Sequence, residues 1–387
     1  MTYKETHPWI TFQLDLREME YHTWLQLGDA QSKCSHIAGV PLLPEIAKRL
    51  HHIFLAKGVL ATTAIEGNTL TEEEVQKRIS GELKLPPSRE YLGKEIDNVV
   101  EACNKIANDI LRGEPTDLSV SNIKEYNRLI LKNLPLDEDV VPGEIRLYSV
   151  GVGRYRGAPA ENCEYLLNEL CTWLNDDFIA PKEEYKISFG ILKAILAHLY
   201  LAWIHPFGDG NGRTARLIEF QILLSVGVPS TAAQLLSNHY NKTRNEYYRQ
   251  LDMSSKSGGN IMPFIQYALE GFIDGLVEQI ELIKMQQLHV HWINFIHDSF
   301  RDLNSATDLR RRQLVLDLTN QTEPVPINEL RHISPLIAEA YVGKTLKTIQ
   351  RDINKLVKMQ LIEKTKKGIR VKRELMLAFL PGVRSGE

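Results

Sequence analysis

Apolar residues recur three or four positions apart along most of this chain, with polar residues between them. This spacing places the apolar side chains on one face of a helix. A strand-like alternation occurs near 143–159 and in a short stretch that begins at 361. The fold class is therefore predicted to be mostly α. The expected helices cover 43–64, 95–111, 119–131, 162–174, 184–204, 237–251, 263–300 and 309–318.

The pattern divides the chain into four expected regions. They are an N-terminal helical region over 1–112, a core over 113–260, a long connecting helix within 261–305 and a C-terminal domain over 306–387. Residues 1–40 are expected to form a lead-in packed on the body, with an amphipathic stretch at 16–27. Thr71 and Glu74 have the spacing of a capping box, which predicts the start of a helix.

Composition indicates the class of protein and the cellular compartment. The chain has 387 residues, of which 43% are hydrophobic and 25% charged, as is ordinary for a globular protein of two or three domains. We expect no apolar run long enough to cross a membrane, and the first residues lack the apolar segment of a signal peptide. The four cysteines show no C-x-x-C spacing, which favours buried thiols in a reducing cytoplasm.

The densest chemistry lies at 205–216, between two apolar helical segments. This position predicts a loop whose glycines open the second helix. The first turn of a helix offers free backbone N–H groups and the positive end of the helix dipole, and both attract phosphate. Gly210 and Gly212 would let the backbone approach an anion closely.

Four charged or titratable side chains accompany the glycines. Arg213 and Arg216 are three residues apart, so they share a helix face and can both bind phosphate oxygens. Asp209 offers a hard oxygen ligand for Mg²⁺. His205 is a base that titrates near neutral pH. Together these residues indicate chemistry on a nucleotide phosphate.

The stretch His205-Pro-Phe-Gly-Asp-Gly-Asn-Gly-Arg-Thr-Ala-Arg216 fills every position of H-x-F-x-D/E-G-N-G-R-x-x-R, the signature of the Fic family. The chain therefore resembles the protein adenylyltransferases of that family over about 43–251. A charged helix–loop–helix on the surface would not account for this set of residues. The kinase-like branch of the family carries Lys where this chain has Gly212, so the resemblance implies AMP transfer.

The resemblance also implies a role for each signature residue. His205 would take the proton from a target hydroxyl, Asp209 would hold Mg²⁺, and ATP would bind along the start of the second helix. The implied nucleotide-binding residues are Gly210, Asn211, Gly212, Arg213, Thr214 and Arg216. The implied fold is a Fic-type helical bundle with a short β-hairpin.

A second motif precedes the signature. Thr62, Glu66 and Gly67 fit S/T-x-x-x-E-G/N, the inhibitory motif of many Fic proteins. On the residues alone, Glu66 is a polar side chain near a helix end. The resemblance implies instead that Glu66 pairs with Arg216, the second arginine of the signature, and removes the cation that would hold the γ-phosphate of ATP. The enzyme would then be autoinhibited by its own N-terminal region.

The strand-like segment has a family counterpart called the flap, which covers the nucleotide site. A target protein adds to its edge as an extra strand, a mode of binding with modest side-chain specificity. We expect the flap at 146–157, with Val152, Gly153, Arg154 and Tyr155 as its target-facing residues. A surface hairpin that carries arginines is the alternative.

Two aromatic positions outside the signature leave alternatives open. In related chains a tyrosine of a comparable pair lies near the adenine, which the resemblance carries onto Tyr247. Ordinary helix packing would explain Tyr247 equally well. His198 could be a second catalytic histidine, but its apolar neighbours favour a hydrogen-bonded core residue.

The C-terminal region is strongly basic. Residues 341–373 contain eleven Lys or Arg and only two acids, Asp352 and Glu363, in a chain of net charge −3. Expected helices at 328–340 and 345–359 precede a basic hairpin from 361, an order that resembles a winged helix. Such domains place the second helix in the DNA major groove, so DNA binding through 344–372 is one hypothesis. Protein contact or dimerisation is the other.

The preferred interpretation is a cytoplasmic, autoinhibited adenylyltransferase that uses ATP and Mg²⁺ to modify Ser, Thr or Tyr of a target protein. Its target binds along the flap, and self-modification is a further option. One alternative is removal of AMP, with Glu66 orienting a water. Another is a DNA-binding regulator that uses the signature domain to sense ATP. A homodimer through the long helix stays open, and no membrane partner is expected.

Overall fold

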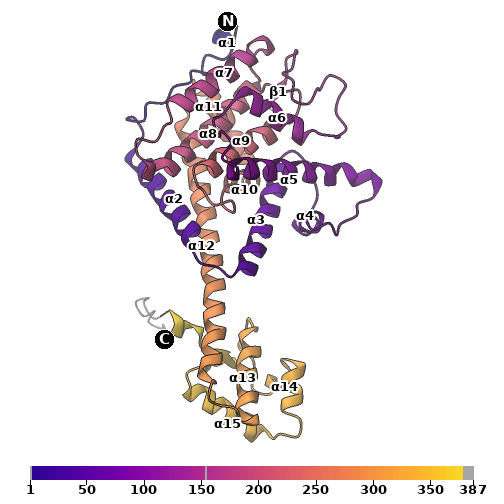
Figure 1. Cartoon of the computed structure of the whole chain (residues 1–387), viewed down its shortest axis with the longest axis vertical. Helices are drawn as coiled ribbons and strands as arrows, with labels where there is room; N and C mark the ends of the chain where they lie inside the picture. Colours follow the sequence, from indigo (N-terminus) through magenta and orange to yellow (C-terminus); the bar gives the residue numbers. More distant parts are fainter. Residues whose placement is uncertain (1, 153–154, 378–387) are drawn as a thin grey trace. The chain divides into compact units, whose positions relative to one another are not determined.

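The computed structural model describes residues 2–152 and 155–377, and over these residues the chain is mostly helical. Contacts divide the chain into two compact units, Met1–Ile280 and Glu281–Glu387 (Figure 1). The expected regions 1–112 and 113–260 both fall inside the first unit. The mostly α fold class is confirmed.

The first unit is a bundle of helices with one small hairpin. Its elements are α1 (Tyr3–Thr6), α2 (Tyr21–Gly39), α3 (Pro44–Ala64), α4 (Glu72–Ile79), α5 (Glu90–Leu111), α6 (Val120–Ile130), β1 (Gly151–Val152), β2 (Tyr155–Arg156), α7 (Ala160–Asp176), α8 (Lys186–Ile204), α9 (Asn211–Ser225), α10 (Leu235–Lys242), α11 (Arg244–Lys256) and α12 (Met262–Ser299), with 3₁₀ turns at Pro87–Arg89 and Glu183–Tyr185. α12 runs on into the second unit.

Helix α8 forms the centre of this bundle. It is apolar on all sides, and such a helix has to be buried. Length and composition alone would allow the helical stretch Glu183–Ile204 to cross a membrane, so the expectation that no apolar run is long enough is wrong. However, 78% of the most apolar part of that stretch is buried by other parts of the protein, as in the core helix of a globular domain.

Most predicted helices are confirmed to within a few residues, and one is not. In the lead-in, where an amphipathic stretch was expected at 16–27, the helix is α2 (Tyr21–Gly39), and before it Asp15 accepts the Arg17 backbone N–H at 2.9 Å in a turn. The single helix expected over 237–251 is two helices, α10 and α11, separated at Thr243. The Thr71–Glu74 capping box is confirmed, with its reciprocal bonds at 3.2 and 2.8 Å.

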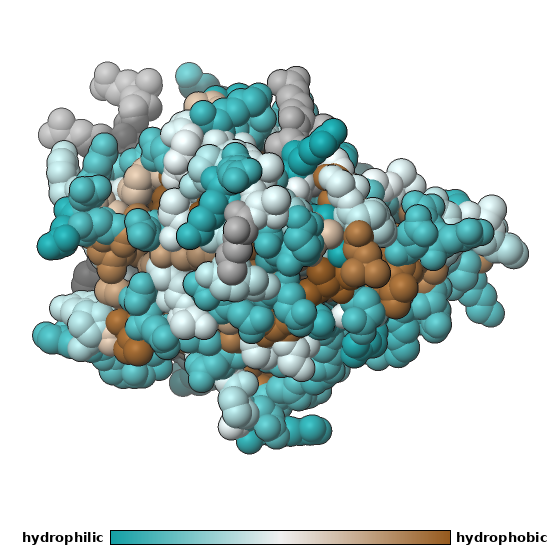
Figure 2. All heavy atoms as spheres, turned by 90° about the horizontal axis from the view of Figure 1, so that it is seen from above, coloured by the Kyte–Doolittle hydropathy of each residue, from teal (hydrophilic) through white to brown (hydrophobic). Residues whose placement is uncertain are grey.

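The exterior of the protein in the view of Figure 2 is mainly hydrophilic. Hydrophobic side chains gather there only in small separate patches. The large apolar residues of the first unit are instead buried, many of them completely. Examples are Trp203, Tyr200, Phe207 and Phe264.

Over its described residues, the second unit is built from the end of α12 and further elements with a core of their own. They are α13 (Ala306–Thr319), α14 (Pro335–Ala340), α15 (Leu346–Lys358) and an antiparallel hairpin of β3 (Ile362–Lys364) and β4 (Ile369–Val371), with 3₁₀ turns at Leu330–His332 and Arg373–Met376. Trp292 of α12 is fully buried in this core and donates its indole N–H to Thr319 at 2.9 Å.

One buried carboxylate ties three helices of this unit together. Asp352 of α15 is 1% exposed. Its oxygens accept bonds from Arg310 and Arg311 of α13 at 2.8 to 2.9 Å, and from the hydroxyl of Tyr341 after α14 at 3.0 Å. Because these donors surround the Asp352 carboxylate, its negative charge can be buried in the core.

We expect Asp352→Ala to lower the stability of the second unit strongly, because the substitution leaves two part-buried guanidinium groups without their carboxylate. Loss of one partner of a buried ion pair costs about 3 kcal/mol or more. Amide hydrogen exchange of α15 in the full chain would measure the loss. The matched control is Glu363→Ala, which removes the half-exposed pair with Arg370 and should cost at most about 1 kcal/mol. Equal protection in the two variants would contradict the prediction.

Candidate functional site

The loop between α8 and α9 begins with an unusual backbone turn. His205 caps the end of α8 with φ of 50°, in the left-handed region that non-glycine residues rarely adopt. Gly210, at the start of α9, has φ of 77°, and a Cβ there would lie 2.9 Å from the Asn127 side-chain nitrogen. The glycine is therefore needed at this position both for the backbone angle and for space.

Arg146 holds the His205 turn in place. This residue is 3% exposed, and its guanidinium donates to the backbone carbonyls of His205 at 2.8 Å, Tyr148 and Ala158. Its own backbone N–H donates to the Pro206 carbonyl at 3.0 Å. Burial lowers the pKa of Arg146, although it remains far above neutrality. The base of the flap is thereby anchored to the signature loop, a role that its position in the hairpin pattern did not reveal.

The imidazole of His205 is oriented for use as a base. Its Nδ1 lies 3.4 Å from the Ala202 carbonyl oxygen. In the tautomer that donates this proton, Nε2 carries a lone pair. Desolvation lowers the pKa of His205 to about 4, so the ring is neutral at pH 7. A Cβ at Gly157 would lie 2.8 Å from the His205 Cβ, which shows how closely the second flap strand ends beside this histidine.

A carboxylate of the protein covers the expected anion site at the start of α9. A Cβ at Gly212 would overlap an oxygen of Glu66, so the close approach predicted for Gly212 is made here by that side chain. Glu66 follows α3 and remains 31% exposed. Burial alone would raise its pKa, but the charge of Arg216 outweighs this and holds the pKa below its ordinary value.

The same glutamate binds the second signature arginine, across 150 positions of the sequence. Arg216 donates from Nη2 to Glu66 at 2.5 Å, and from Nε to the Thr62 hydroxyl at 2.7 Å. Nη2 also contacts the Thr62 carbonyl at 2.9 Å. Arg216 is 3% exposed. The structure thus brings together Thr62, Glu66 and Arg216, as the resemblance implied.

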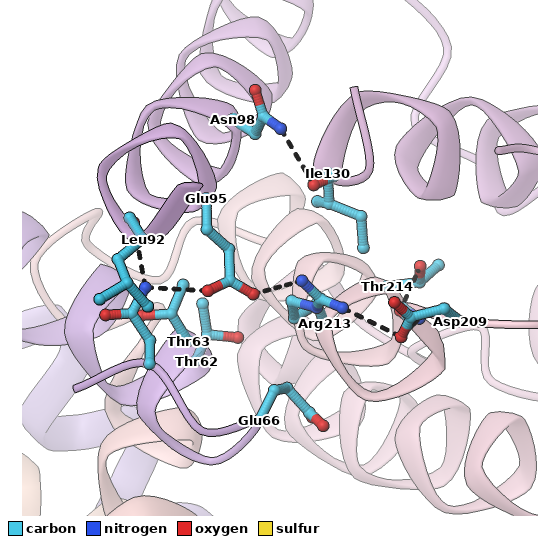
Figure 3. Close-up of polar contacts among 12 residues, drawn as sticks. Thr62, Thr63, Glu66, Leu92, Glu95, Asn98, Ile130, Asp209, Arg213 and Thr214 are labelled. Atoms are coloured by element: carbon cyan, nitrogen blue, oxygen red, sulfur yellow. Dashed lines mark hydrogen bonds and ion pairs between the residues drawn. The ribbon is translucent and has the colours of Figure 1, made fainter. Parts of the chain in front are cut away.

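The first signature arginine is held by carboxylates too (Figure 3). Arg213 pairs with Glu95 of α5 and with Asp209 at 3.0 Å. The other oxygen of Glu95 accepts from Asn68 at 2.8 Å, two residues after Glu66. Burial raises the pKa of Glu95 more than Arg213 lowers it. Nothing in the spacing of the sequence marked Glu95, because its partner lies on another helix.

Two signature side chains, those of Asn211 and Thr214, face the loop itself, and their predicted nucleotide contacts stay a prediction. The Asn211 amide donates to the Phe207 carbonyl at 2.8 Å and accepts the Phe207 N–H at 2.9 Å, so the side chain closes the loop. Thr214 is fully buried and donates to the Gly210 carbonyl at 2.8 Å. The backbone N–H of Thr214 also donates to the Gly210 carbonyl, at 2.8 Å, so of these two residues it is Asn211 whose backbone N–H lies in the first helical turn and can be offered to an anion.

Asn127, a buried residue of α6, holds the signature loop in place by hydrogen bonds. The amide nitrogen of Asn127 donates to the Asp209 carbonyl at 2.9 Å and lies 3.3 Å from the Thr214 hydroxyl. Its oxygen accepts the Gly143 N–H at 2.9 Å. In the sequence, the signal for this role was a polar residue on the otherwise apolar, buried face of α6.

The tyrosine expected near the adenine lies in a buried network. Tyr247 is 3% exposed, stacks on Tyr240, and has its hydroxyl 2.8 Å from Nε2 of His198. His198 Nδ1 lies 3.1 Å from Glu219, which also accepts from the Tyr240 hydroxyl. His198 is therefore the hydrogen-bonded core residue that was favoured. These contacts of Tyr247 are those expected for helix packing, and its contact with adenine stays a prediction.

The flap is a hairpin of two very short strands. Gly151 pairs with Arg156, and Val152 pairs with Tyr155, in antiparallel register. Gly153 and Arg154, two of the expected target-facing residues, lie outside the described residues. The hairpin also contacts the N-terminal lead-in, where a ring nitrogen of His7 lies 2.9 Å from the Arg156 carbonyl.

Among the carboxylates around α9, Asp209 is the candidate metal ligand. No group of three or more His, Cys, Asp or Glu that could hold a metal occurs in the described part of the chain. Asp209, however, has a side chain 47% exposed at the mouth of the loop. Mg²⁺ is commonly held by one or two carboxylates together with substrate phosphates and water, and Asp209 fits that arrangement.

Comparisons with known proteins agree with this geometry. Residues 117–223 match the model of the Fic/DOC family. A protein adenylyltransferase, fic-1, of Caenorhabditis elegans is 28% identical over 62% of this chain, and a protein adenylyltransferase Fic of Nematostella vectensis is 30% identical over 53%. The chain spans only 43% and 44% of the length of these two relatives.

Solved structures extend the likeness of the fold. A Fic family protein from Desulfovibrio desulfuricans superposes with a TM-score of 0.57 at 19% identity, and the match covers 93% of this chain and 98% of the other. The Fic-1 structure from C. elegans gives a TM-score of 0.55 at 25% identity, over 68% of this chain and 73% of that one. Both likenesses support a Fic-type helical fold.

We expect His205 to titrate near pH 4, well below the ordinary histidine value of about 6.5. NMR of the histidine ring carbons across pH, assigned with His205→Ala, would measure this. Between about pH 6.5 and 4 the unfolded chain binds a proton at His205 that the folded chain does not. This residue therefore reduces stability progressively as the pH falls through that range. A midpoint near 6.5 would contradict the burial argument.

Proposed function

We propose, from the match of residues 117–223 to the model of the Fic/DOC family, that the chain is an autoinhibited protein adenylyltransferase. It transfers AMP from ATP to a Ser, Thr or Tyr hydroxyl of a target protein and releases pyrophosphate. The observation that carries this proposal is the placement of a neutral, oriented His205 beside a helix start that bears two buried arginines.

The reaction is an in-line transfer at the α-phosphorus. The target hydroxyl gives its proton to Nε2 of His205, and its oxygen forms a bond to the α-phosphorus. The bond from that phosphorus to the bridging oxygen of the β-phosphate breaks, and pyrophosphate leaves. The low pKa of His205 keeps the ring unprotonated and ready to accept this proton at pH 7.

The start of α9 would hold the triphosphate. The backbone N–H groups of Asn211, Gly212 and Arg213 are the free donors of a first helical turn. The guanidinium groups of Arg213 and Arg216 supply positive charge where negative charge develops. Asp209 would hold Mg²⁺, which would neutralise phosphate charge during the transfer.

The resting state of the proposed enzyme depends on Glu66. An incoming γ-phosphate needs the cation of Arg216, but that guanidinium already binds Glu66 and both oxygens of Thr62. The Glu66 carboxylate also lies against Gly212, where its negative charge would repel the phosphates. Autoinhibition follows from both effects.

Removal of AMP is a second candidate, favoured by one observation. Glu66 is partly exposed, and its pKa is lowered by the nearby charge of Arg216 against the effect of burial. It is therefore an ionised carboxylate, which could orient a water for attack on an AMP-modified hydroxyl. Incubation of a modified target with the wild-type chain, without ATP, distinguishes this activity by release of AMP that depends on Glu66.

We expect Glu66→Gly to raise AMP transfer by about tenfold or more, a change of about 1.4 kcal/mol, because it frees Arg216 and uncovers Gly212. Transfer of label from α-labelled ATP to the protein itself and to lysate proteins would measure it. The control Glu66→Gly/His205→Ala should lose about 10²-fold or more. A Glu66→Gly variant no more active than wild type would show that the inhibitory assignment is wrong.

We expect Thr62→Val to activate the enzyme as well, but less than Glu66→Gly. The substitution removes the 2.7 Å bond to Nε of Arg216 and leaves the glutamate in place. Thr63→Val is the matched control, because among the described residues the Thr63 hydroxyl bonds to carbonyls of its own helix, at 2.9 and 3.1 Å, and not to Arg216. The same labelling assay ranks the three variants, and equal rates for Thr62→Val and Thr63→Val would count against this contact.

A further inference from the structure

The exposed side of α15 carries a row of basic residues. Lys347, Arg351, Lys355 and Lys358 are spaced by four, four and three positions, so they lie on one helix face, and all four are exposed. The opposite face is fully buried in the core of the second unit through Ile349, Ile353 and Leu356. The helix is thus divided between a packed side and a free basic side.

The β3–β4 hairpin extends this side. Lys364 of β3 donates to the side-chain oxygen of Asn354 on α15 at 2.8 Å, and Gln350 of α15 donates to the same oxygen at 3.0 Å. The first strand therefore lies beside the exposed helix face. Lys366 and Lys367, in the turn of the hairpin, are exposed too. We call these residues of α15 and the hairpin, Lys347 to Lys367, the basic face.

The acids of this segment do not neutralise the basic face. Asp352 is buried on the other side of α15 and is compensated by Arg310 and Arg311. Glu363 pairs with Arg370. Within the described residues, the four basic side chains of α15 form no ion pair closer than 4 Å. Their charge is therefore free to act on a ligand in solution.

We propose that the basic face binds duplex DNA, with α15 in the major groove and the hairpin against the sugar–phosphate backbone. An exposed helix fits the B-form major groove, whereas the major groove of duplex RNA is too narrow for it. Single strands are usually held by stacking on aromatic side chains, and the basic face has none. Lysines spread over helix and hairpin can contact several phosphates.

This DNA-binding site does not rest on the proposed AMP transfer. None of the residues proposed for catalysis, nucleotide binding or inhibition belongs to the second unit. Binding can therefore be measured without ATP, and failure of either proposal leaves the other standing.

Fluorescence anisotropy of a labelled 30-base-pair duplex of mixed sequence with the full chain tests the proposal. We expect a dissociation constant of about 10⁻⁶ to 10⁻⁴ M at physiological salt, with binding that tightens at lower salt and weakens steeply as salt rises. Arg351→Ala/Lys355→Ala should weaken binding about tenfold or more and reduce the salt slope by about 2. Unlabelled duplex RNA and single-stranded DNA should compete less well than duplex DNA.

The matched control is Lys284→Ala/Arg301→Ala, which removes the same charge from exposed positions of this unit outside the basic face. It should bind like wild type. Circular dichroism melting checks that both double variants are folded. The proposal is overturned if wild type does not bind the duplex, if the two double variants bind equally, or if duplex RNA or single-stranded DNA competes as well as duplex DNA.

Discussion

The contact between Arg216 and the pair Thr62 and Glu66 is the constraint on which the first unit depends. A guanidinium that is 97% removed from solvent is costly to bury unless its donors are met by acceptors, and a carboxylate is the strongest of these. Helix α3 must therefore end against the start of α9. The interaction joins the end of α3 to the start of α9, and the proposed autoinhibition rests on it.

The first signature arginine is also buried and paired, but with other carboxylates. Arg213 is paired with Glu95 of α5 and with Asp209, and Asn68 links Glu95 to the segment that carries Glu66. The start of α9 attracts anions because of its free N–H groups and its arginines. In this structure, carboxylates of the chain itself meet this attraction, and under the proposed function a triphosphate would compete with them.

Much of this arrangement could be predicted from the sequence, and some residues could not. The helix pattern, the capping box at Thr71 and the set from His205 to Arg216 are local features that recur within a few positions. The roles of Glu95, Asn127 and Arg146 could not be predicted, because each residue contributes through contacts with residues far away in the chain. The contact by which the Asn211 amide closes the loop on Phe207 was not predicted either.

The sequence by itself determined the chemical groups and the local elements: the helices, the glycines at the start of α9 and the base, arginines and carboxylate of the signature. These depend on short-range periodicity and on the order of residue types. Tertiary structure alone decided which carboxylate meets which arginine, and which buried side chains hold the signature loop. These outcomes depend on helices packing across as many as 150 positions, and burial there decides which charges must be paired.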